Sequence, residues 1–239
     1  MIPRHLYDSD HEMFRDSVRK FLETEAMPHH EQWEKDGMVS DEIWLKAGEQ
    51  GFLCPMVPEE YGGVDTDFLY NCIVNEEVSR SGCSGLGWTL HNDISVPYIV
   101  RYGSDYQKQT YLPRCVSGEL ITAIAMTEPS AGSDLQGTKT TAVLDGDHYI
   151  LNGSKTFITN GQKAGLVIVV AKTDPTAGSK GISLFLVEAD LPGFSKGKNL
   201  NKLGLKAQDT SELFFQDVKA VSYTHLRAHE TDSYLVCRL

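Results

Sequence analysis

The chain has 239 residues, of which 41% are hydrophobic and 23% charged, so its composition is that of a globular protein with one large or two modest domains. Its formal net charge of −11 disfavours a nonspecific nucleic-acid binder, because such a protein needs excess positive charge to neutralise phosphates. Its longest apolar runs, such as residues 166–171, fall far short of the roughly 18 to 20 residues that span a bilayer, so we expect no transmembrane segment.

The N-terminus carries acidic residues early and has no apolar stretch, so we expect neither a secretory signal nor a mitochondrial transit sequence. The five cysteines are scattered and form no C-x-x-C pair, which is typical of reduced thiols in a cytosolic-type protein. No histidines, cysteines or carboxylates gather at metal-ligand spacing, so we expect no metal site.

Residues 1–119 read as helical and hold the whole charge imbalance, with 10 basic and 21 acidic side chains. Ser9 and Glu12 have the spacing of a capping box, which predicts a helix that begins there and ends at Pro28. Further helices are predicted over residues 40–51 and 67–79, while Pro97 leaves residues 84–101 undecided. A second capping box, Ser104 with Gln107, predicts a helix that runs to Gly118.

Residues 120–239 carry 12 basic and 12 acidic side chains, and their apolar pattern changes to that of strands. Asp145-Gly146 suits the tight turn of a hairpin, and residues 165–173, 181–189 and 213–218 are rich in strand-forming residues. Several strands without helices between them favour an antiparallel barrel or sandwich. Residues 222–239 show no clear period and fit nothing before them.

Two segments carry the candidate chemistry. In the first, a strand ends at Thr127 and small residues form a tight turn, whose backbone N–H groups suit a phosphate or a flat polar ring; by itself, however, this pattern is more often an ordinary β-connection. In the second, strand alternation places Phe157 and Thr159 on one face, where an aromatic plane and a hydroxyl donor suit an isoalloxazine ring; the alternative is a half-buried strand with a routine aromatic.

Taken together, MTEPSAGSDLQG at residues 126–137 and LNGSKTFITNG at residues 151–161 resemble the acyl-CoA dehydrogenase family. PEEYGG near residue 60, GISLFLVEAD at 181–190 and KLGLKAQDTSELFFQDV at 202–218 support the resemblance, which covers about residues 8 to 220. The sequence is most similar to the long-chain acyl-CoA dehydrogenase branch of the family.

The resemblance implies an all-α N-terminal helical domain over residues 1–119, followed by an antiparallel β-barrel middle domain over residues 120–221 that binds FAD and acyl-CoA. It implies that FAD is contacted by one turn and one strand, namely by Ile124, Ala125, Met126, Thr127, Glu128, Pro129, Ser130, Ala131, Gly132, Ser133, Phe157, Ile158 and Thr159. Within this set Thr127 is expected beside the pyrimidine edge and Thr159 as the donor to flavin N5. The substrate is expected to meet Ser133, Ser179 and Lys180, and further lysines at 196, 198, 202 and 206 are either handles for the CoA anion or plain solvated side chains.

The family resemblance further implies the reaction and its partners. The reaction is α,β-dehydrogenation of an acyl-CoA to the trans-2-enoyl-CoA, with electrons passed to an electron-transfer flavoprotein. The full-length parent is expected to be a homo-oligomer, a dimer or tetramer, in a bacterial cytoplasm or in the mitochondrial matrix. Ser130 replaces a common glycine of the motif and Phe157 a common tryptophan, and both replacements are compatible if Ser130 needs no positive φ.

The family draws its catalytic glutamate from a C-terminal helical domain that this sequence does not continue into, so we expect no catalytic base here. Glu230 is the only glutamate among residues 222–239, and no motif supports it as the base. We expect those residues to be a non-native or disordered tail, and the chain to retain little FAD and to turn over negligibly. The alternatives are a non-catalytic acyl-CoA or flavin binding fragment and an acyl-CoA oxidase-like enzyme.

Overall fold

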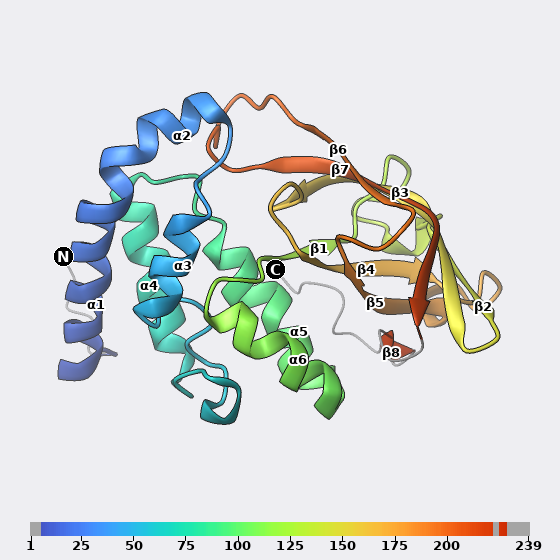
Figure 1. The fold of residues 1–239 in the computed structure, drawn as a ribbon, viewed down its shortest axis with the longest axis horizontal. Helices are drawn as coiled ribbons and strands as arrows, with labels where there is room; N and C mark the ends of the chain where they lie inside the picture. Colours follow the sequence, from blue (N-terminus) through green and yellow to red (C-terminus); the bar gives the residue numbers. More distant parts are fainter. Residues whose placement is uncertain (1–5, 222–224, 229–239) are drawn as a thin grey trace.

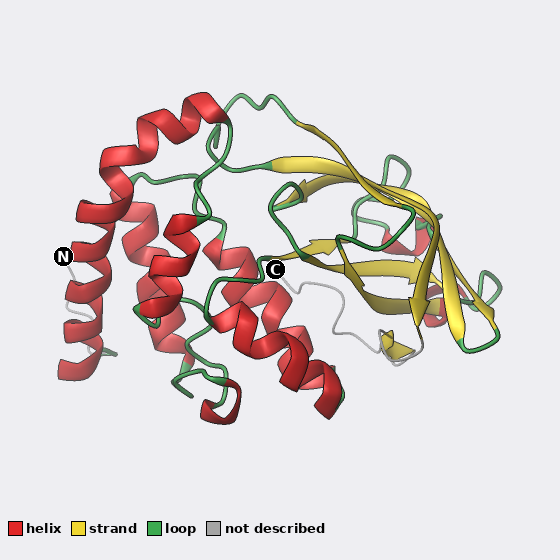
Figure 2. Ribbon diagram, in the orientation of Figure 1, coloured by secondary structure: helices red, strands yellow, loops and turns green. Residues whose placement is uncertain are grey.

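The computed structural model describes residues 6–221 and 225–228, in which helices come first and strands follow. The helices pack as one group beside a curled sheet, and the chain passes from one to the other at β1 (Figures 1 and 2). The α-helices are α1 (Ser9–Phe21), α2 (His30–Asp36), α3 (Glu42–Glu49), α4 (Phe68–Ser81), α5 (Val96–Tyr102) and α6 (Asp105–Val116). The strands are β1 (Thr122–Ala125), β2 (Thr141–Asp145), β3 (His148–Thr159), β4 (Leu166–Lys172), β5 (Ile182–Glu188), β6 (Phe194–Asn199), β7 (Thr210–Val221) and β8 (His225–Ala228).

The first helix starts one residue earlier than predicted. Asp8, not Ser9, is its N-cap, and the Asp8 carboxylate accepts from the backbone N–H groups of Asp10 and His11. The His11 ring completes the capping box in place of Glu12, since its Nδ1 lies 3.3 Å from the Asp8 backbone nitrogen. The predicted pairing of Ser9 with Glu12 is therefore wrong, although the predicted helix exists.

Pro28 does not end the first helical segment as predicted. The chain continues beyond α1 through a π-helical turn (Leu22–Ala26) and a 3-10 turn (Met27–His29) into α2. Pro28 lies at the start of the 3-10 turn, where its missing N–H is not needed. The helical path ends at Gly37, whose φ of +78° is the left-handed conformation that favours glycine.

The later helix starts follow the sequence more closely. Asp67 caps α4 by accepting from the Leu69 N–H, and Ser104 and Gln107 form the predicted reciprocal capping box of α6. The undecided stretch around Pro97 is helical, because Pro97 occupies the first turn of α5.

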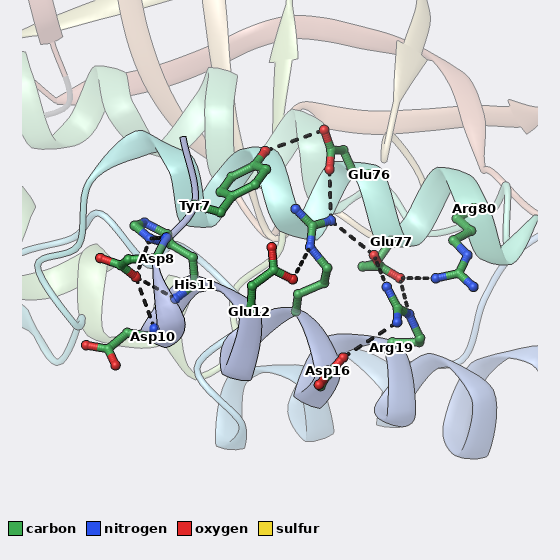
Figure 3. A network of polar contacts seen from close by, with 11 residues as sticks. Tyr7, Asp8, Asp10, His11, Glu12, Asp16, Arg19, Glu76, Glu77 and Arg80 are labelled. Carbon is green, nitrogen blue, oxygen red and sulfur yellow. Dashed lines mark hydrogen bonds and ion pairs between the residues drawn. The ribbon is translucent and has the colours of Figure 1, made fainter. Parts of the chain in front are cut away.

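A buried carboxylate joins α1 to α4 (Figure 3). The Glu77 side chain, only 4% exposed, accepts from Arg19 Nε and Nη2 at 2.9 Å each and from Arg15 Nη1 at 3.1 Å. Arg80 Nη1 lies 3.6 Å from the same carboxylate. Burial alone would raise the pKa of Glu77, but the hydrogen bonds from Arg19 and Arg15 outweigh it, and the net pKa is lowered.

We expect Glu77→Gln to lower the free energy of unfolding by about 2 kcal/mol, because it leaves the arginine guanidiniums without their charged acceptor. Denaturant unfolding at neutral pH measures this change. Glu31→Gln is the matched control, since Glu31 forms an exposed pair with Lys35 on α2 and its loss is expected to cost at most about 0.5 kcal/mol. Equal losses in the two variants would contradict the prediction.

The strands form one sheet in the order β6-β7-β3-β2-β4-β5-β8, with β1 paired to β4. The fold class is confirmed as a helical part followed by a barrel-like curled sheet, but the sheet is mixed rather than wholly antiparallel. Strands β1 and β4 pair in parallel over four residues, and β2 meets β4 in parallel at Thr141 and Lys172. The other pairings are antiparallel, including the predicted β2–β3 hairpin. Its turn is one residue later than predicted, at Gly146-Asp147, because Asp145 still belongs to β2 and pairs with His148.

Strand β4 is buried on both faces, which explains its unbroken apolar sequence. Leu166, Ile168 and Val170 belong to the hydrophobic core shared with the helices. Val167 and Val169 belong to a second core inside the curl of the sheet. Because successive side chains point to opposite faces, a strand between two cores needs apolar residues at every position.

Only part of residues 222–239, expected to be a non-native or disordered tail, lies within the described residues. Residues 225–228 form β8, which pairs antiparallel with β5 at the edge of the sheet. The remainder, Glu230 included, lies outside the described residues.

Candidate functional site

The first candidate segment leaves the sheet at the end of β1 and turns back at once. Glu128 and Ala131 exchange backbone hydrogen bonds, at 2.8 Å from Glu128 N to Ala131 O and 3.1 Å from Ala131 N to Glu128 O. The tip of this tight turn, at Pro129 and Ser130, is exposed. Ser130 is not among the residues of positive φ, so it needs no glycine.

The second candidate segment is the end of β3, which lies directly beside this turn. Thr156 N–H donates to Thr127 O at 2.9 Å, and Lys155 Nζ donates to Met126 O at 3.0 Å. The strand is irregular here, with a bulge between Lys155 and Ile158 relative to β7. The structure thus brings together two sequence segments that are about thirty residues apart.

Burial divides the predicted flavin residues into two groups. Phe157, with φ of +58°, is 68% exposed, and Thr127 and Thr159 are half-buried. The buried group exposes almost no surface to a ligand in this fold; it comprises Ile124, Ala125, Glu128, Ala131 and Ile158. The accessible group comprises Met126, Thr127, Pro129, Ser130, Gly132, Ser133, Phe157 and Thr159.

Phe157 and Thr159 are both accessible and Ile158 between them is buried, although the bulge after Lys155 and the positive φ of Phe157 interrupt the regular alternation along β3. An exposed aromatic ring two residues from an accessible hydroxyl is a surface on which a flat heteroaromatic ring can stack and receive a hydrogen bond. The exposed turn beside it offers backbone groups and small side chains. These residues therefore fit a flavin, although their roles stay predictions.

The predicted substrate residues Ser179 and Lys180 lie in a 3-10 turn (Gly178–Gly181) between β4 and β5. Ser179 is half-buried and Lys180 exposed. This turn contacts another 3-10 turn (Leu135–Gly137), which follows Ser133 closely in sequence. The structure thus places Ser179 and Lys180 beside the residues that follow the first candidate segment.

Two of the lysines considered as handles for an anion are already used within the fold. Lys196 Nζ donates to Gln162 O at 2.7 Å and to Ala164 O at 2.8 Å, and burial lowers the pKa of Lys196. Lys202 Nζ donates to Gln208 O, and burial lowers its pKa as well. Lys180, Lys198 and Lys206 remain exposed, so only these three stay candidates for binding an anion.

The sequence analysis missed the residue that joins the two candidate segments. Lys155 is fully buried, and its Nζ lies 2.8 Å from the Glu128 carboxylate. The signal was present, because period-two counting from the core residue Leu151 puts Lys155 on the inward face. A lysine at such a position needs a buried acceptor, and Glu128 supplies it.

The described residues contain neither a candidate metal site nor a candidate membrane-spanning helix. No three histidine, cysteine or acidic side chains there converge as a metal site would require. Among the same residues, no helix has both the length and the apolar character needed to cross a bilayer.

Comparison with known proteins gives two domain matches that cover most of the chain. Residues 8–119 match the acyl-CoA dehydrogenase N-terminal domain, and residues 123–218 match the acyl-CoA dehydrogenase middle domain.

A similar curated protein is the mitochondrial long-chain specific acyl-CoA dehydrogenase of Sus scrofa, 54% identical over 90% of this chain and 51% of its own length. A similar solved structure is an acyl-CoA dehydrogenase from Geobacillus kaustophilus, with a TM-score of 0.92 and 56% identity over 95% of this chain and 60% of that one. A glutaryl-CoA dehydrogenase from Mycobacterium smegmatis, solved in complex with FADH2, gives a TM-score of 0.87 at 33% identity, covering 95% of this chain and 58% of its own. The chain thus spans about half the length of the curated relatives it matches.

Proposed function

Because the chain belongs to the acyl-CoA dehydrogenase family and contains its N-terminal and middle domains, we propose that it forms the flavin- and thioester-binding half of an FAD-dependent acyl-CoA dehydrogenase. The parent protein would convert a long-chain acyl-CoA to the trans-2-enoyl-CoA, and the 54% identity to the Sus scrofa long-chain enzyme supports this substrate class. The observation that carries the proposal is the junction of the two candidate segments, where Thr156 N–H bonds Thr127 O.

The residues of this chain would bind the flavin and the substrate and orient them relative to each other. Phe157 would stack on the flavin, and Thr127 and Thr159 would hydrogen-bond its ring edges. Ser133, Ser179 and Lys180 would contact the substrate, Lys180 as a charge for the CoA portion. When bound, FAD supplies the acceptor for the hydride that leaves the β-carbon.

The turn after β1, over residues 127–133, does not supply the base that removes the α-proton. Glu128 is the one carboxylate of this turn, and it is buried and already accepts from Lys155 and two backbone N–H groups. We propose that the base comes from a segment beyond the two matched domains, because the family resemblance implies a glutamate from a C-terminal helical domain. Its task is demanding, because the α-proton becomes acidic only when hydrogen bonds polarise the thioester carbonyl.

The same relatives support proposals for the partners and the compartment of the parent protein. We propose that it passes electrons to an electron-transfer flavoprotein and assembles as a homo-oligomer. A mitochondrial matrix or a bacterial cytoplasm fits the mitochondrial and bacterial origins of its relatives.

Titration of FAD into the purified chain, followed by quenching of FAD fluorescence, tests the flavin site. We expect weak but saturable binding, and we expect Thr159→Val to weaken it about tenfold through the loss of one hydrogen bond. Thr24→Val is the matched control, because the Thr24 hydroxyl bonds within the helical part, to Lys20 O. Absence of binding, or equal affinity in the two variants, would count against the proposed site.

A further inference from the structure

A buried ion pair lies between the two segments of the proposed flavin site. The Glu128 side chain is 3% exposed and the Lys155 side chain 0%, with 2.8 Å between Oε1 and Nζ. The carboxylate also accepts from the backbone N–H groups of Lys139 at 2.6 Å and Thr140 at 3.0 Å. The pair therefore has its partners in place on both sides.

The contacts of this pair connect three segments of the chain. Glu128 belongs to the turn after β1, Lys155 to β3, and the two backbone donors to the approach to β2. Lys155 also donates to Met126 O, and the neighbouring Thr156 N–H bonds Thr127 O. The spacing between turn and strand is thus set by one buried cluster.

Burying such an ion pair costs desolvation free energy, so a contribution to folding stability explains its presence poorly. Two apolar side chains of similar volume often serve a folded core equally well or better than an ion pair. Burial alone would raise the pKa of Glu128, but the hydrogen bonds from Lys155, Thr140 and Lys139 lower it, so the carboxylate is held ionised. An ion pair with several directional hydrogen bonds restricts geometry more closely than an apolar contact does.

The restriction acts next to the exposed ring of the proposed site. Phe157 stands two residues after Lys155, at φ of +58° and within the bulge relative to β7. A bulged segment has lost part of its strand pairing, so the neighbouring anchor decides where its side chains point. Lys155 is that anchor on one side.

We propose that Glu128 and Lys155 are positioning residues that hold the turn over residues 127–133 and the Phe157–Thr159 segment at the separation that a single flavin ring requires. This inference rests on the proposed flavin function. Neither side chain would touch the cofactor, because both are enclosed by the fold.

The test compares Glu128→Gln, Lys155→Met and the double variant E128Q/K155M with the wild-type chain. The first readout is backbone hydrogen exchange over residues 127–133 and 156–160, which needs no flavin. We expect both segments to exchange faster together in each single variant. The second readout is FAD affinity by fluorescence titration, which we expect to fall at least tenfold.

The double variant separates positioning from plain stability. It removes both charges, so no buried charge is left uncompensated, and we expect thermal stability to recover in part. FAD affinity is expected to remain low, because the ion pair that holds the two segments is still missing. Glu77→Gln is the matched control, since it breaks a buried carboxylate network between α1 and α4 and should leave FAD affinity and both segments unchanged.

Recovery of FAD affinity together with stability in the double variant would overturn the inference, as would faster exchange in only one of the two segments. If the wild-type chain binds no FAD, the proposed function fails. Hydrogen exchange then tests the positioning role by itself. Faster exchange in both segments supports this role, and faster exchange in only one segment refutes it.

Discussion

Lowering the pH from 7 to 4 is expected to destabilise the folded chain by about 3 kcal/mol through His91 alone. The His91 ring is fully buried, and burial lowers its pKa from 6.5 to about 4. Between these two values the unfolded chain binds a proton at this position and the folded chain does not. Stability therefore falls as the pH drops from about 6.5 and levels off below about 4.

Burial, rather than the hydrogen bonds of the ring, explains why His91 resists protonation. In the neutral ring Nε2 donates to Cys115 O at 3.0 Å, while Nδ1 accepts from the backbone N–H of Thr122 at 3.2 Å and lies 2.7 Å from the Thr122 hydroxyl oxygen. The bond to Cys115 O favours the protonated ring, but placing a charged imidazolium where water does not reach costs more, so the net pKa is lowered. Trp44 covers the ring, with 5.4 Å between ring centroids.

Urea unfolding of the wild-type chain and of His91→Gln at a series of pH values measures this contribution. Glutamine can donate to Cys115 O but does not titrate, so the variant is expected to lose most of the slope between pH 6.5 and pH 4. His29→Gln, at an exposed position, should keep it. An unchanged slope in His91→Gln would show that other groups cause the acid sensitivity.

The sequence predicted those features that depend on local pattern. The capping box of Ser104 and Gln107 and the start of α4 at Asp67 each need only neighbouring residues, and each is present. The predicted hairpin is present as well, with its turn one residue later, at Gly146-Asp147. Pro28 misled because a proline excludes a helix interior but not the start of a helical turn.

Long-range features were not readable from single segments. Strand pattern did not show that β1 pairs in parallel with β4, because pairing direction depends on how the chain returns to the sheet. The ion pair of Glu128 and Lys155 joins positions 27 residues apart, and only the folded sheet brings them together. Each candidate segment alone has a common turn or strand pattern, and the two were singled out because together they resemble motifs of the acyl-CoA dehydrogenase family.

Asn160 is a further residue whose role appears only in three dimensions. It follows Thr159 directly, is 1% exposed and has φ of +60°. Its Nδ2 donates to Gly87 O and to Thr122 O at 3.2 Å each, and its Oδ1 accepts from Gln208 Nε2 at 2.9 Å. One side chain therefore connects the helical part, β1 and the loop before β7.

Asn160→Ala is expected to lower the free energy of unfolding by about 3 kcal/mol, since it removes one hydrogen bond each from two buried carbonyls and one buried amide and places alanine at a positive φ. Asn152→Ala is the matched control on the same strand: Asn152 exchanges two exposed hydrogen bonds with Asp217, and its loss should cost less than about 1 kcal/mol. Denaturant unfolding of both variants measures the difference. Similar losses would mean that water or neighbouring groups replace the buried partners of Asn160, and that the helical part and the sheet are held together elsewhere.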